Sequence, residues 1–120
     1  MNATDISAPQ SEAMLCGQHV MLRFDHDMMR LTEIYFQQTS GFRQSYYGIV
    51  DLAAVRGYGG LGAIAYGAVA SAARADKKTP IGIEEFDQRC TYEELRACAD
   101  TLLEGALSSL PKKENGAKKE

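Results

Sequence analysis

Alternating apolar and polar residues near the N-terminus predict a short β-hairpin over residues 13–24. In its second half, Val20, Leu22 and Phe24 fall on one face, which is the period-two pattern of a half-buried strand. Gly17-Gln18 is the predicted turn. Because two strands alone are marginally stable in water, we expect this hairpin to lie on helices or on another chain.

Helical periodicity occupies most of the remaining sequence. Asp25 is a good N-cap for the first helix, and Thr91 with Glu94 forms a capping box for the last. The glycine-rich stretch 57–60 predicts a break, and a shorter helical turn is expected around Phe86. Apolar residues at three- and four-residue spacing predict the longer helices over these ranges: 26–38, 42–55, 61–74 and 91–110.

These elements predict a mostly α fold: a small helical domain with a short N-terminal β-hairpin and flexible termini. Residues 1–12 are polar and aperiodic, so we expect a flexible arm there. Residues 13–110 form the single predicted domain, and residues 111–120 form a hydrophilic tail with four Lys and two Glu. A chain of 120 residues has room for one small domain.

The composition indicates that the core contains few large apolar side chains. Leu, Ile, Val and Phe make up 24 of the 120 residues, whereas 16 residues are Ala. Such a chain gains stability from close Ala/Gly helix packing or from a partner subunit. The net charge of -3 argues against nucleic-acid binding through a basic stripe. We also expect no membrane span, because the longest apolar stretch is short and mostly Gly and Ala.

Small residues and tyrosines define the candidate interaction surface. One face of the third long helix carries almost no side-chain bulk, so another backbone can approach it closely. Tyrosine is a preferred contact residue at interfaces, although core packing explains these tyrosines equally well; for Tyr92 we favour the core. The candidate surface for self-association or partner binding comprises Tyr46, Tyr47, Tyr58, Ala63, Gly67 and Ser71.

Catalytic, metal and cofactor sites are not predicted. Cys16 and His19 have the spacing of two zinc ligands, but no second pair completes a set of four. Three pairs of acidic residues lie close together in the sequence: Asp25 and Asp27, Glu84 and Glu85, and Glu93 and Glu94. Helix caps and solvated faces explain them better than acid–base catalysis does. The odd number of cysteines, three, argues against a disulfide framework. We therefore expect a non-enzymatic protein without cofactors.

The order of several short signals resembles the tail assembly chaperones of long-tailed bacteriophages and prophages. The resemblance covers roughly residues 13–120. In chain order, it rests on Leu22-Arg23-Phe24-Asp25, Thr32-Glu33, the Ala/Gly segment Leu61–Ala68, Pro80, Glu85-Phe86, Tyr92-Glu93-Glu94-Leu95 and the ending Ser109-Leu110-Pro111-Lys112. The three cysteines and the arm 1–12 are not features of that family.

The resemblance implies a function in assembly. Such chaperones bind the tail tape-measure protein, and often the tail tube protein, while the tail is built. It also implies a helical homo-oligomer that works in the cytoplasm of the bacterial host and is absent from the mature virion. The alternative is a small oligomeric structural component of a phage tail or connector, which would remain in the particle.

Overall fold

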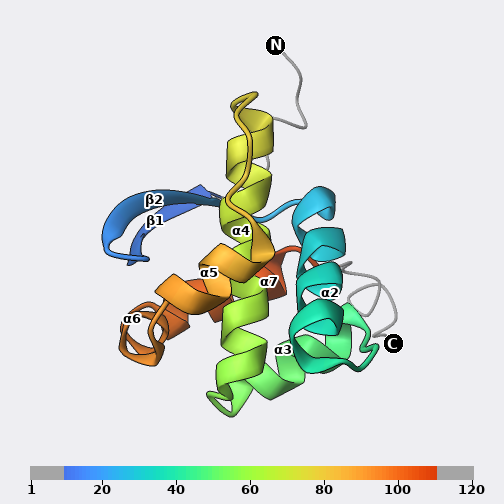
Figure 1. The fold of residues 1–120 in the computed structure, drawn as a ribbon. Helices are drawn as coiled ribbons and strands as arrows, with labels where there is room; N and C mark the ends of the chain where they lie inside the picture. Colours follow the sequence, from blue (N-terminus) through green and yellow to red (C-terminus); the bar gives the residue numbers. More distant parts are fainter. Residues whose placement is uncertain (1–9, 111–120) are drawn as a thin grey trace.

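The computed structural model describes residues 10–110 of the chain. It shows an N-terminal hairpin followed by helices. Within this part of the chain, two antiparallel strands precede six helices (Figure 1). The predicted fold class, mostly α with a short N-terminal hairpin, is therefore confirmed. The predicted tail 111–120, and residues 1–9 of the predicted arm, lie outside the described residues.

The hairpin consists of β1 (Gln10–Leu15) and β2 (Gln18–Arg23). Its turn is Cys16-Gly17, with φ angles of 54° and 76°, as a two-residue type I′ turn requires. The prediction was wrong in two places: the turn lies one residue earlier, and Gln10–Glu12, assigned to the arm, pair with β2. All three residues are polar. The sequence therefore has no alternation of apolar residues that would predict this part of the strand.

The predicted alternation along the hairpin is confirmed. Leu15 and Leu22 are fully buried, whereas Met14 and Met21 on the opposite face are about half exposed. The buried face packs mainly against α4 (Tyr58–Ala75). The hairpin therefore obtains from a helix the apolar support that two isolated strands lack.

Helix α2 (His26–Ser40) begins at the predicted cap, Asp25. The Asp25 carboxylate accepts hydrogen bonds from Met28 N–H at 2.9 Å, the Ser71 hydroxyl at 2.6 Å and Arg23 Nε at 2.9 Å. Burial raises the pKa of Asp25, but the hydrogen bonds outweigh burial and lower it. This carboxylate thus joins β2, α2 and α4 in its ionised form.

The break between the next two helices lies earlier than predicted. Helix α3 covers Tyr46–Ala54 after its cap Ser45, and α4 begins at Tyr58, so the break is residues 55–57. Gly60 is therefore helical. A Cβ at this position would lie 2.6 Å from the Ala53 nitrogen, so the glycine permits α4 to cross α3 closely rather than ending a helix.

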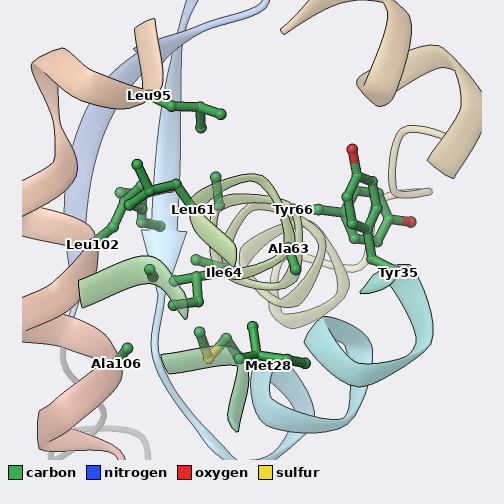
Figure 2. Close-up of a cluster of buried hydrophobic side chains, with 14 of the residues drawn as sticks. Met28, Tyr35, Leu61, Ala63, Ile64, Tyr66, Leu95, Leu102 and Ala106 are labelled. Atoms are coloured by element: carbon green, nitrogen blue, oxygen red, sulfur yellow. The ribbon is translucent and has the colours of Figure 1, made fainter. Parts of the chain in front are cut away.

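Helix α4 is the centre of the domain, and nearly every residue from Gly60 to Ser71 is buried. Figure 2 looks along this helix: Leu61 and Ile64 point toward α7, and Tyr66 points toward Tyr35 of α2. A helix that is apolar all round needs partners on every side. The other elements supply them (Figure 1).

The face of α4 with little side-chain bulk is covered by α2 of the same chain. A Cβ added to Gly67 would collide with Thr32 Oγ1 and lie 2.7 Å from the Met28 carbonyl oxygen. Ala63 and Ser71 are 0% and 1% exposed. The close backbone approach predicted for this face is therefore present, and it occurs within the chain.

Helix α5 (Ile83–Arg89) confirms the short helical turn predicted around Phe86. The Phe86 ring meets Tyr35 and Tyr66 edge-on, with ring centroids 5.8 and 5.5 Å apart. Tyr35 and Tyr66 stack on one another at 4.8 Å. Aromatic pairs in these geometries stabilise beyond their buried area, so this cluster fastens α5 to α2 and α4.

The last predicted helix is wrong as a single element. It is divided into α6 (Tyr92–Ala97) and α7 (Ala99–Ser108) at Cys98, whose φ and ψ of -114° and 19° leave helical geometry. Leu95 and Leu102 are both fully buried, and both point toward α4 (Figure 2). Because residues seven apart share one face of a continuous helix, the two leucines keep their places in the core although the helix is interrupted between them.

The predicted capping box at Thr91 is confirmed, and its Glu94 also holds the hairpin turn. Glu94 accepts hydrogen bonds from the N–H groups of Thr91 at 3.0 Å, Cys16 at 3.1 Å and Gly17 at 2.8 Å. Arg89 Nη2 donates to the Cys16 carbonyl at 3.2 Å. One carboxylate therefore begins α6 and anchors the tip of the hairpin to it.

Replacing Gly67 with Ala is expected to lower the free energy of unfolding by about 2 kcal/mol, because the new methyl group meets α2 backbone and Thr32. Gly67→Leu should be more destabilising. Gly82→Ala is the matched control, since a Cβ there meets nothing within 4 Å. Thermal melts of the three variants check this, and equal melting temperatures for Gly67→Ala and wild type would refute the close packing.

Glu94→Gln is expected to lower stability by about 1 to 2 kcal/mol at neutral pH, because charge-assisted hydrogen bonds are lost. Burial raises the pKa of Glu94, but hydrogen bonds from Thr91, Gly17 and Cys16 outweigh it and lower the pKa. The contribution is therefore present above the unfolded pKa, near 4.3, and lost as pH falls through the folded pKa. Urea unfolding at pH 7 and pH 3 should show the gap between wild type and variant closing; a gap independent of pH argues against this role.

Candidate functional site

The six candidate surface residues divide into a buried and an exposed group. Four are buried within the chain, which corrects their assignment to a surface: Tyr46, Ala63, Gly67 and Ser71. The other two, Tyr47 and Tyr58, are 51% and 42% exposed. The sequence correctly predicted close packing at Ala63, Gly67 and Ser71, but it did not show which helix packs against them.

Tyr46 is a core residue that joins three helices. It is 2% exposed, and its hydroxyl donates to the Ala106 carbonyl oxygen of α7 at 3.1 Å and lies 3.4 Å from Met28 Sδ of α2. Burial raises the pKa of the Tyr46 hydroxyl well above its usual value. The hydroxyl is therefore permanently protonated and structural.

The two exposed tyrosines do not share a site. Tyr47 lies in the first turn of α3 and Tyr58 begins α4, after α3 has ended. Nine helical residues span about 13 Å, so the tyrosines mark opposite ends of α3. We build the candidate site around Tyr58, because other exposed apolar side chains gather there.

Three exposed apolar residues lie around the junction of α3 and α4, which is at the bottom of Figure 1, and Tyr92 of α6 joins them through its ring contact with Tyr58. We call this group the corner patch: Leu52 (39% exposed), Val55 (76%), Tyr58 (42%) and Tyr92 (39%). Single exposed apolar residues are ordinary, but a group of them marks an interaction surface.

Hydrogen bonds hold the two tyrosines of the corner patch in place. Their ring centroids are 6.1 Å apart. The Tyr92 hydroxyl donates to the Arg56 carbonyl oxygen at 2.9 Å, and the Tyr58 hydroxyl to the Cys90 carbonyl oxygen at 3.4 Å. Partial burial raises the pKa of Tyr58. Both hydroxyls therefore face the protein, while part of each ring remains open to solvent.

Arg56 shapes the patch through its backbone. Its φ of 62° lies in the left-handed region, which is unfavourable for a residue with a Cβ. Its N–H donates to the Ala53 carbonyl at 2.8 Å, and its side chain pairs with Asp100 at 2.9 Å. These contacts maintain a sharp corner that leaves the preceding residue, Val55, largely exposed.

Three members of the corner patch were not predicted. Tyr92 was assigned to the core, but its ring is partly exposed because its hydroxyl reaches across to Arg56. Leu52 lay inside the predicted helix 42–55 and Val55 at its last position, and neither was predicted to be exposed. The signal that distinguishes Val55 is its position two residues before Gly57, directly after the last residue of α3.

Cys16 and His19, the pair with the spacing of zinc ligands, lie in different surroundings. Cys16 is 7% exposed in the turn, whereas the His19 side chain is 70% exposed and pairs with Glu12 at 3.3 Å. Asp25 and Glu94 cap helices, as expected. Within residues 10–110, no group of three or more His, Cys, Asp or Glu side chains is arranged to hold a metal ion.

A groove of about 580 Å³ runs between β2 and the C-terminal part of α4. Two of its polar side chains already have partners within the chain: Lys78 pairs with Asp76 at 3.2 Å, and His19 contacts Glu12 at 3.3 Å. It is lined by Gln10, His19, Val20, Met21, Arg23, Val69, Ala72, Ala73, Ala75, Asp76 and Lys78. We therefore keep the corner patch as the candidate site.

Comparisons with family models, curated proteins and solved structures give no match to this chain. Among the helices between residues 10 and 110, none combines the length and the apolar character needed to cross a bilayer.

Tyr92→Phe is expected to lower the free energy of unfolding by about 1 kcal/mol, because the hydrogen bond to Arg56 is lost while the ring remains. Tyr47→Phe is the matched control: in the described part of the chain no partner is seen for the Tyr47 hydroxyl, so stability should not change. Urea unfolding of both variants measures the difference. If the two variants unfold alike, the Tyr92 hydroxyl does not hold the corner.

Proposed function

We propose that this protein is a tail assembly chaperone of a long-tailed bacteriophage or prophage, which acts by reversible protein binding without catalysis. The proposed partner is the tail tape-measure protein, with the tail tube protein as a second. The order of motifs along the sequence suggests this family. The single observation on which the binding role rests is the corner patch.

Three properties make the corner patch suitable for binding. Tyrosine rings provide a large contact area with few rotatable bonds, so little conformational entropy is lost on binding. The hydroxyls of Tyr58 and Tyr92 are already bonded to backbone carbonyls, so the rings are positioned before a partner arrives. Val55, at 76% exposed, provides an aliphatic contact beside them.

This arrangement supports a chaperone that covers apolar segments of its partner. Long helical tape-measure segments expose apolar side chains before assembly, and burying such surface is favourable by about 25 cal/mol per Å². We propose that the protein does this in the host cytoplasm as a homo-oligomer and leaves before the virion is complete.

Co-expression with the tape-measure protein encoded nearby tests the proposal. The partner should become soluble and co-purify with wild type. Val55→Asp should abolish both effects, while its stability stays within about 0.5 kcal/mol of wild type because the side chain is exposed. Phe42→Asp is the matched control: Phe42 is 73% exposed but precedes α3, so binding should persist.

Failure of wild type to bind or solubilise the tape-measure protein would overturn the chaperone assignment. Presence of the protein in purified virions at a constant copy number would identify the alternative, a structural component of the tail or connector. Equal loss of binding in Val55→Asp and Phe42→Asp would show that the contact is not made by the corner patch.

A further inference from the structure

The second strand of the hairpin has an edge that faces no other strand. Within residues 10–110, the sheet consists of β1 and β2 alone. In a hairpin with a two-residue turn, the residues that flank the turn exchange both hydrogen bonds, and bonded and non-bonded pairs then alternate. Leu15 and Gln18 are the flanking pair. The N–H and C=O groups of His19 and Met21 therefore point away from β1.

These outward-facing backbone groups of His19 and Met21 are available for pairing. No hydrogen bond to them is seen in the part of the chain that the structure describes. A row of N–H and C=O groups on a sheet edge is a template for another extended chain, which supplies the complementary groups at the same spacing. The edge of β2 therefore has the chemistry to accept a third strand.

The groove of about 580 Å³ between β2 and α4 lies along this edge. Val20 and Met21, whose side chains lie on opposite faces of the hairpin, both line it. Its other wall is the C-terminal part of α4, which extends beyond the hairpin (Figure 1). There Val69, Ala72 and Ala73 leave room for a backbone because their side chains are small. A volume of this size is typical of a site for a small ligand, so the groove fits one extended segment rather than a second folded domain.

The charges of the groove favour an acidic segment over a basic one. Arg23 and Lys78 are cationic, and Asp76 is the single carboxylate among the described residues that line the groove. The side chains of Lys78 and Asp76 are 74% and 69% exposed. A surface ion pair of this kind contributes little to stability, so Lys78 is available to a carboxylate of a bound segment.

We propose that the edge of β2 and the adjoining groove bind an extended segment of a partner protein, which adds to the hairpin as a third strand. The backbone of the segment pairs with His19 and Met21, and every second side chain lies against the small apolar residues of α4. The segment has apolar residues at alternate positions and an acidic residue that reaches Lys78. This surface shares no residue with the corner patch, so the inference does not rest on the proposed function.

A library of random peptides displayed on phage and selected on the immobilised full-length protein tests the proposal. Enriched peptides should alternate apolar and polar residues and carry more Asp and Glu than Lys and Arg. A synthetic enriched peptide should slow amide hydrogen exchange at His19 and Met21. The amide of Val20 is the internal control, because it already pairs with β1 and its exchange should not change.

Two matched proline variants locate the contact. Proline lacks an N–H group and is tolerated in an edge strand where that group faces outward. Met21→Pro should weaken binding of the synthetic peptide by about tenfold or more, because a hydrogen bond is lost and the ring obstructs the edge. Met14→Pro makes the same change at the outer edge of β1, where the side chain is 50% exposed against 47% for Met21, and binding should persist.

Hydrogen exchange in the wild-type protein decides the matter even where a proline variant folds poorly. A library without enriched binders, enrichment of basic peptides, or peptide-induced protection away from His19 and Met21 would each overturn the proposal. Equal binding by Met21→Pro and Met14→Pro would also contradict it. Protection of the same two amides that rises with protein concentration in the absence of peptide would assign the edge to a second copy of the chain instead.

Discussion

The close approach of α2 to α4 at Gly67 is the contact on which the rest of this structure depends. Few large apolar side chains are present, so the core cannot be filled by bulk. Gly67 instead brings the backbones together, with Thr32 and Met28 directly above it, and short distances increase the dispersion energy gained per buried atom. The Asp25–Ser71 hydrogen bond fixes the same pair of helices at one end. Alanine and glycine thus provide a packed core where composition alone suggested a weak one.

The sequence correctly predicted the helix starts that depend on hydrogen bonds between residues close together in the chain. Asp25 and the Thr91–Glu94 capping box satisfy N–H groups within three residues of themselves, so they can be recognised without the fold. The break at Cys98 cannot be recognised in this way, because neither glycine nor proline marks it. Leu95 and Leu102 lie seven residues apart and would share one face of a continuous helix as well, so the apolar spacing gives no sign of the break either.

Less of the candidate site than of the fold could be predicted from the sequence, because the exposure of a side chain depends on how the helices pack. A stripe of small residues on a helix predicts that another backbone packs closely against it. The sequence does not show whether that backbone belongs to α2 or to a second protein. The spacing of the tyrosines along the sequence likewise does not predict which of them are exposed to solvent. Tyr46 is buried by α7, whereas Tyr92 lies at the surface because its hydroxyl reaches the corner at Arg56. Surface location is a property of the assembled chain, and the corner patch includes Tyr92, for which the sequence favoured the core.

The corner patch and the hairpin tip are connected through the junction of α5 and α6. The carbonyl oxygen of Cys90 accepts the hydrogen bond that orients Tyr58. Arg89, the residue before it, donates to the Cys16 carbonyl in the hairpin turn, and Glu94 accepts from the N–H groups of the same turn. One short stretch, residues 89–94, therefore holds both the tip of the hairpin and one ring of the proposed binding surface. The order of that surface thus depends on contacts between residues that are far apart in the sequence, which is why the helical pattern alone does not define it.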